Sequence, residues 1–136
     1  MTKRNYHYLY VEDDALSREV MIILLENLVG VGSLTIFEES KDFMARLRAV
    51  APKPDFILLD IHVKPLDGYE ILRLLRSDAD YQECKLVAVT ASVMTDEVQK
   101  LKGDGFDGAL AKPLDMSTFP ELIERLEAGE AVWQVN

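Results

Sequence analysis

The sequence predicts an α/β protein built on a doubly wound parallel sheet, that is, a three-layer (βα)5 sandwich. Two observations predict this fold class. Apolar runs of strand length alternate with amphipathic segments of helix length along the 136 residues. Several of these runs are continuously apolar, which is typical of strands that are covered on both faces. Strand–helix units in series therefore favour a central parallel sheet with helices on either side.

Each element follows from its local pattern. The strands are expected over residues 6–11, 34–37, 56–60, 86–90 and 108–111. The helices are expected between and after them, over residues 16–28, 41–50, 69–77, 96–102 and 116–128. In the first helix, Val20, Leu24 and Leu28 recur at helical spacing. Gly103 and Gly105 are expected to end the fourth helix, and N-caps are expected at Ser40, Thr95 and Asp115.

Composition sets the broad class of protein. The length fits one domain over residues 1–136, with a core of about residues 5–128 and a tail over residues 129–136. The net charge of −9 argues against direct nucleic-acid binding, which needs a basic face. Cys84 is the single cysteine, so no internal disulfide is expected. Without a signal-peptide core or a membrane-spanning stretch, the expected location is the cytoplasm.

Polar residues end four of the five apolar runs. Glu12 and Asp13 follow the first run, Asp60 closes the third, Thr90 closes the fourth and Lys112 follows the fifth. The carboxyl ends of parallel strands meet at one edge of the sheet, where ligands bind in this fold class. Carboxylates, a hydroxyl and an ammonium at that edge predict a site for a divalent cation and a phosphoryl group.

The residue types suit phosphoryl transfer. Asp60 ends the strand expected at the centre, and a carboxylate can accept a phosphoryl group as an acyl phosphate. Because carboxylates repel an incoming phosphate, a Mg²⁺ ion is expected, with Asp13 and Asp60 as direct ligands. Glu12, which is one carbon longer, is expected to act through water. Lys112 and Thr90 are expected to contact phosphoryl oxygens.

Four short segments occur together in a characteristic order. They are residues 11–14 (Val-Glu-Asp-Asp), 58–61 (Leu-Leu-Asp-Ile) with Asp67 and Gly68, 89–91 (Val-Thr-Ala) and 111–113 (Ala-Lys-Pro). Each is weak alone, but the set is specific. On these segments the chain resembles the receiver domain of bacterial two-component response regulators, of the single-domain chemotaxis type. The resemblance implies a flavodoxin-like five-stranded sheet in the order 2-1-3-4-5.

The resemblance also implies residue roles. Glu12 and Asp13 would be the acidic pair, Asp60 the phosphoacceptor, Thr90 the switch hydroxyl and Lys112 the phosphate-contacting lysine. The backbone carbonyl of His62 would complete the metal site. The bond between Lys112 and Pro113 would be cis.

The implied function is a phosphoacceptor response regulator. A histidine kinase or a histidine phosphotransfer protein would supply the phosphoryl group, and an unknown downstream protein would receive the signal. The chain would catalyse only its own phosphotransfer and autodephosphorylation. Two alternatives are a phosphorylation-independent interaction or scaffold module and a receiver cut from a longer protein. A homodimer is left open.

Two positions depart from the family pattern. Ala109 replaces an aromatic residue that the family commonly has three residues before the lysine, so switching is expected to depend on the backbone of residues 91–95. Lys64 replaces the usual proline, and Pro65 follows one position later. In the tail, Trp133 is expected either to fold back on the domain or to contact a partner.

Overall fold

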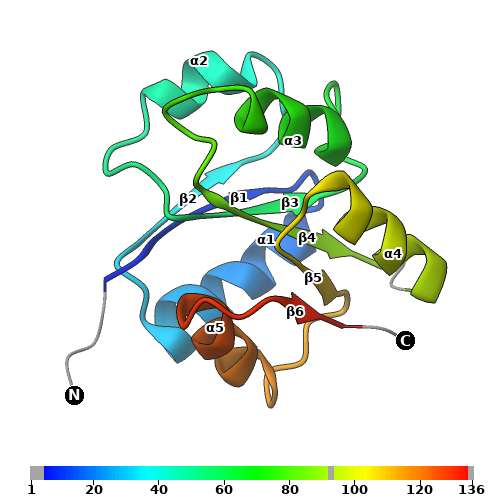
Figure 1. The fold of residues 1–136 in the computed structure, drawn as a ribbon. Helices are drawn as coiled ribbons and strands as arrows, with labels where there is room; N and C mark the ends of the chain where they lie inside the picture. Colours follow the sequence, from blue (N-terminus) through cyan, green and yellow to red (C-terminus); the bar gives the residue numbers. More distant parts are fainter. Residues whose placement is uncertain (1–4, 92–93, 135–136) are drawn as a thin grey trace.

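A six-stranded parallel sheet forms the centre of the computed structural model, which describes residues 5–91 and 94–134. The strand order is β2-β1-β3-β4-β5-β6, with parallel pairing throughout. The strands are β1 (His7–Val11), β2 (Ser33–Phe37), β3 (Phe56–Asp60), β4 (Lys85–Thr90), β5 (Gly108–Ala111) and β6 (Val132–Trp133). The predicted fold class and the predicted order of the first five strands are confirmed (Figure 1).

The sheet has one strand more than the sequence predicted. β6 lies in the segment expected to be a tail, and its Val132 and Trp133 pair with Gly108 and Ala109 of β5. Two residues are too few for a periodic pattern to indicate a strand, so the contact with β5 decides this element. Of the two interpretations of Trp133, the structure supports the first, because the side chain packs against the domain.

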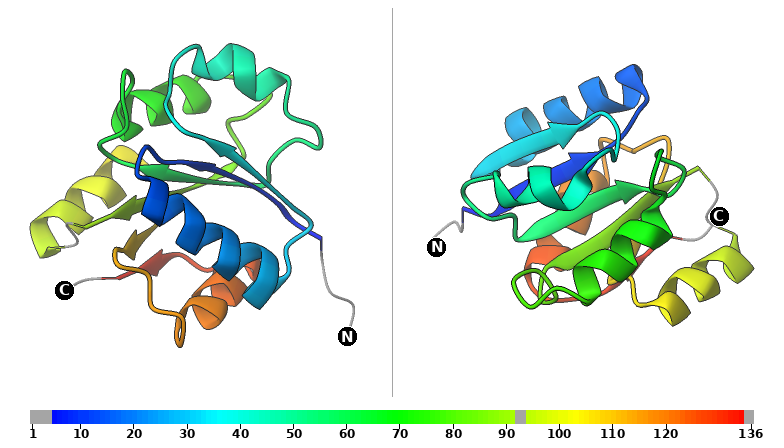
Figure 2. Two further views of the ribbon diagram at one scale, coloured as in Figure 1. Left: turned by 180° about the vertical axis from the view of Figure 1, so that it is seen from behind. Right: turned by 90° about the horizontal axis from the view of Figure 1, so that it is seen from above.

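Helices cover both faces of the sheet. They are α1 (Ala15–Ile22), η1 (Ile23–Val29), α2 (Phe43–Arg48), α3 (Gly68–Arg76), α4 (Thr95–Asp104) and α5 (Phe119–Glu127). α1, η1 and α5 enclose one apolar cluster, and α2, α3 and α4 enclose the other (Figures 1 and 2). None of the described helices is both long enough and apolar enough to cross a membrane.

The first helix changes its hydrogen-bonding pattern halfway along. α1 continues directly into η1, which is a π-helix, so the segment predicted as one helix has two parts. The N–H of Gly30 donates to the carbonyl of Leu25, five residues earlier, at 2.9 Å. Gly30 ends the helix with a φ of 79°, a left-handed conformation that glycine adopts without a steric penalty. Gly105, with a φ of 109°, ends α4 in the same way.

The three predicted N-caps are wrong. The Ser40 hydroxyl donates instead to the carbonyl of Leu66 at 2.6 Å, which joins two loops that are distant in sequence. Thr95 already lies inside α4. Asp115 accepts a hydrogen bond from the N–H of Ser117 at 2.9 Å, in a turn that precedes α5. For Ser40 the cause is a contact with a distant loop, which the local sequence does not specify, whereas Thr95 and Asp115 differ from the prediction only by local shifts of the helix start.

The start of α3 carries a reciprocal cap that can be tested. Asp67 Oδ1 accepts from the N–H of Glu70 at 2.9 Å, and Glu70 Oε1 accepts from the N–H of Asp67 at 3.2 Å. We expect Asp67→Ala to lower the free energy of unfolding by about 1 kcal/mol in urea titrations, because a helix N–H loses its acceptor. Asp67→Asn keeps an acceptor oxygen and should stay close to wild type. Equal losses in both variants would show that the negative charge matters rather than the cap.

Candidate functional site

The candidate site lies where the carboxyl ends of β1, β3, β4 and β5 meet. The register places Val11 of β1 beside Leu59 of β3. The next residue in each segment, Glu12 after β1 and Asp60 at the end of β3, therefore lies at the same edge of the sheet. Thr90 of β4 pairs with Ala111 of β5, the residue before Lys112. The parallel register thus brings the predicted residues from four separate segments to one edge of the sheet.

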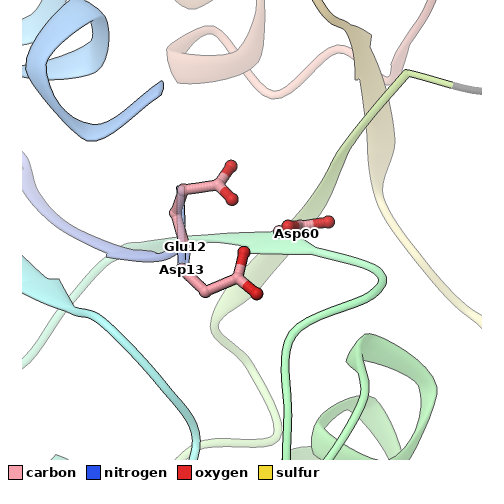
Figure 3. Close-up of side chains that lie close together, drawn as sticks. All are labelled: Glu12, Asp13 and Asp60. Atoms are coloured by element: carbon pink, nitrogen blue, oxygen red, sulfur yellow. The ribbon is translucent and has the colours of Figure 1, made fainter. Parts of the chain in front are cut away.

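Three carboxylates gather at this edge. One oxygen each of Glu12, Asp13 and Asp60 lie within 4.8 Å of one another. Glu12 and Asp13 come from the turn after β1, and their carboxylates point to the side on which Asp60 lies (Figure 3). Glu12 is fully buried and Asp60 is 7% exposed, whereas Asp13 is exposed. The cluster therefore has one carboxylate open to solvent and two set into the protein.

Glu12 is held by protein groups on both of its oxygens. Oε1 accepts a hydrogen bond from the Tyr10 hydroxyl at 2.7 Å and lies 2.5 Å from Lys112 Nζ. Oε2 accepts from the N–H of Asp14 at 3.2 Å. Burial, together with the hydrogen bond to Glu12, raises the pKa of Tyr10, so the phenol stays a neutral donor. The Glu12 carboxylate is thus fixed in place behind the more accessible aspartates.

Asp60 is oriented by two neighbours. Its Oδ1 accepts a hydrogen bond from the backbone N–H of His62 at 3.0 Å. Its Oδ2 lies 3.6 Å from Lys112 Nζ. The His62 side chain itself is exposed, so the backbone of this residue forms the contact with Asp60.

Lys112 connects the acidic residues to the end of β5. Its ammonium contacts both Glu12 and Asp60, and its side chain is 20% exposed. The backbone N–H of Lys112 donates to the carbonyl of Thr90 at 2.9 Å. The bond to Pro113 is cis, as the resemblance implies. A single cation therefore serves both buried carboxylates.

Thr90 and the loop after it complete the edge. Thr90 is 4% exposed at the end of β4, and the small Ala91 after it is exposed. The switch movement expected over residues 91–95 falls partly on Ser92 and Val93, which lie outside the described residues.

Sequence reasoning missed two residues that shape the site. Tyr10 is two positions before Glu12, and side chains at i and i+2 of a strand point to the same face, so their contact could have been predicted. Asp14, although it belongs to the acidic run, caps α1 by accepting from the N–H and the hydroxyl of Ser17, both at 2.8 Å. The hydrogen bonds from Ser17 lower the pKa of Asp14. Asp14 is thus a helix cap outside the three-carboxylate cluster.

The Tyr10 contact gives a direct prediction. Tyr10→Phe leaves the buried Glu12 carboxylate one hydrogen bond short, so we expect the free energy of unfolding to fall by about 2 kcal/mol, as for other bonds to charged groups. Tyr8→Phe is the matched control. It removes a hydrogen bond of 2.6 Å to Glu127, which is only partly buried, so its loss should be smaller. Urea titrations of both variants measure the difference, and a larger loss in Tyr8→Phe would contradict the importance of the Glu12 contact.

The fold and this acidic edge together define the class of protein. Residues 8–124 match the profile of the family described as the response regulator receiver domain. Because this match covers most of the chain, the chain belongs to the receiver domain family.

Two curated relatives of this chain are a response regulator and a histidine kinase. The chain is 25% identical over 114 residues to the polar-differentiation response regulator DivK of Brucella anthropi, which covers 84% of this chain and 89% of that protein. It is 29% identical over 122 residues to the signal transduction histidine-protein kinase BarA of Escherichia coli, which covers 90% of this chain. The chain spans only 13% of the length of BarA.

Solved structures share the fold. The signal receiver domain of a DNA-binding response regulator from Colwellia psychrerythraea superposes with a TM-score of 0.79 at 25% identity, covering 91% of this chain and 99% of that one. The receiver domain of the sensor histidine kinase PA1611 from Pseudomonas aeruginosa superposes with a TM-score of 0.73 at 23% identity, covering 90% of this chain and 97% of that one. That second structure has a magnesium ion coordinated in its active-site cleft.

Proposed function

We propose that this receiver domain accepts a phosphoryl group on Asp60 from a histidine kinase or a histidine phosphotransfer protein, with Mg²⁺ bound, and signals through protein contacts. One observation carries the proposal. The carboxylates of Glu12, Asp13 and Asp60 converge within 4.8 Å, and Lys112 lies against two of them. Family membership supports the same conclusion.

The donor set fits a magnesium ion. Mg²⁺ prefers carboxylate and carbonyl oxygens and retains several waters, which suits a site with one exposed carboxylate. Three carboxylates against one ammonium leave a formal excess of two negative charges among these groups. Asp13, Asp60 and the His62 carbonyl would hold the ion. Both oxygens of Glu12 already carry protein contacts, which supports an indirect role through water.

When bound, the ion would neutralise charge on the carboxylates and on the phosphoryl oxygens. The Asp60 carboxylate attacks the phosphorus of a phosphohistidine in line. A P–O bond forms as the P–N bond breaks, and the imidazole nitrogen keeps the electron pair. Lys112 contacts one phosphoryl oxygen and the Thr90 hydroxyl donates to another. Positioning and charge neutralisation are the main demands of phosphoryl transfer.

The proposal assigns no turnover of an external substrate. The chain would catalyse its own phosphorylation and the later hydrolysis of the acyl phosphate. Similarity to a part of BarA, a histidine kinase, and to DivK, a response regulator, supports a phosphorelay setting. The alternative, a phosphorylation-independent interaction module, rests on Ala109 alone.

Intact-mass measurement tests the proposal. Wild-type protein is incubated with acetyl phosphate or phosphoramidate, with Mg²⁺ or with EDTA. We expect a gain of one phosphoryl group with Mg²⁺ and none with EDTA. An unchanged mass with both donors in the presence of Mg²⁺ would favour the phosphorylation-independent module.

The metal ligands give a separate prediction. Mg²⁺ should raise the melting temperature of the wild-type protein, because an ion that binds only the folded state stabilises it by linkage. Asp13→Ala should lose that rise, since it removes the exposed carboxylate of the cluster. Asp42→Ala, which changes an exposed aspartate at the start of α2, is the control and should keep the rise. A full Mg²⁺ response in Asp13→Ala would place the ion elsewhere.

A further inference from the structure

The chain covers the outer edge of β5 with its own C-terminal segment. After α5 the chain turns at Gly129, with a φ of 92°, and returns alongside β5 as β6 (Figure 1). The N–H of Gln134 donates to the carbonyl of Ala109 at 3.0 Å. Residues 131–134, called here the tail segment, therefore cover backbone groups of β5 that an edge strand would expose.

The composition of β5 fits this occupant. Gly108 pairs with Val132, and a Cβ built at Gly108 would lie 2.7 Å from the Val132 carbonyl oxygen. Val132 is 2% exposed within the apolar cluster of α1, η1 and α5. Trp133 packs on the opposite cluster, with Lys102 of α4 lying 5.3 Å from its ring. The tail segment thus joins both layers of the domain through alternating residues.

The tail segment also contacts the strand beside the candidate site. The Gln134 side-chain oxygen accepts a hydrogen bond from the N–H of Ala111 at 2.8 Å. The next residue is Lys112, whose own N–H is bonded to Thr90 on the other side. The backbone leading into Lys112 is therefore held between β4 and the tail segment.

The attachment of the tail segment is small. A water-accessible hollow of about 150 Å³ lies beside it, and Lys85, Phe106, Leu126 and Ala131 are among the residues that line it. The tail segment is held by a few hydrogen bonds, one buried side chain (Val132) and one half-buried side chain (Trp133), so it has fewer attachments to break than the longer strands of the sheet.

We propose that the tail segment is a latch on β5, and that phosphorylation of Asp60 releases it. The inference rests on the proposed function. A phosphoryl group on Asp60 adds anionic oxygens that compete with Glu12 for the Lys112 ammonium. Movement of Lys112 displaces the N–H of Ala111, to which Gln134 is bonded. By linkage, loosening the latch must in turn favour phosphorylation.

Trp133 is the only tryptophan, so acrylamide quenching of its fluorescence reports directly on the latch. With acetyl phosphate and Mg²⁺, we expect the quenching constant of the wild-type protein to rise at least about twofold as the phosphorylated fraction grows. Intact mass is measured on the same samples. Asp60→Asn in the same mixture should show no rise.

Two variants test the latch without phosphate. Gln134→Ala removes the bond to Ala111, and Gly108→Ala places a methyl group against Val132, so both should raise the quenching constant of the unphosphorylated protein. Gln99→Ala, on the exposed surface of α4, is the control and should leave the quenching constant unchanged. Full labelling with unchanged quenching would overturn the latch and leave the proposed function intact. A quenching constant equal to that of the wild type in both Gln134→Ala and Gly108→Ala would also overturn the latch. Absence of labelling would contradict both proposals, and the mass spectrum separates that failure from the others.

Discussion

Asp60→Asn should abolish phosphorylation of the protein. The wild-type chain should gain one phosphoryl group from acetyl phosphate and Mg²⁺, and the variant should gain none in intact-mass spectra. The physical reason is that an amide oxygen is a poor nucleophile and carries no negative charge to share with phosphorus. The variant should still fold, because asparagine keeps an acceptor for the His62 N–H and removes one charge from a crowded acidic site.

The neighbouring aspartate provides a matched control. Asp14 lies outside the three-carboxylate cluster and caps α1, a role that asparagine can also fill. Asp14→Asn should therefore be labelled like the wild type. Full labelling of Asp60→Asn would contradict the assignment of Asp60 as phosphoacceptor, whereas loss of labelling in Asp14→Asn would place Asp14 in the chemistry.

Lys112→Ala should give the largest loss of stability among these variants. Without the ammonium, the Glu12 side chain remains fully buried with only neutral donors. We expect the free energy of unfolding to fall by about 2–3 kcal/mol, less than for a fully buried pair because the lysine is partly exposed. Urea titration in EDTA measures this loss. Lys100→Ala, which breaks an exposed ion pair with Asp104 and a cation–π contact with Tyr69, should cost about 1 kcal/mol or less.

Mg²⁺ should partly rescue Lys112→Ala. The ammonium and the divalent cation neutralise the same carboxylates, so Mg²⁺ should raise the melting temperature more in the variant than in the wild type. A weaker Mg²⁺ response in Lys112→Ala would show that the lysine helps to hold the ion instead of competing with it.

The sequence by itself determined the fold class and the membership of the site. Continuously apolar runs of strand length are typical of strands covered on both faces, and such strands in series with amphipathic helices leave few topologies. The positions of Glu12, Asp13, Asp60, Thr90 and Lys112 at strand ends then follow from the geometry of parallel strands. These patterns extend over only a few residues and recur at each element, so they can be recognised in the sequence alone.

Only the tertiary structure decided which groups contact the site residues and that Val132 and Trp133 form a sixth strand. Glu12 could be read as an exposed carboxylate, yet in the folded chain it is fully buried and contacts Lys112, which follows β5. Ser40 could be read as a helix cap, yet its hydroxyl joins the Leu66 loop. The tail segment becomes a strand because the edge of β5 supplies hydrogen-bond partners and Gly108 leaves space for it. Each of these outcomes depends on groups that are far apart in sequence and meet only after folding, so no local pattern could encode them.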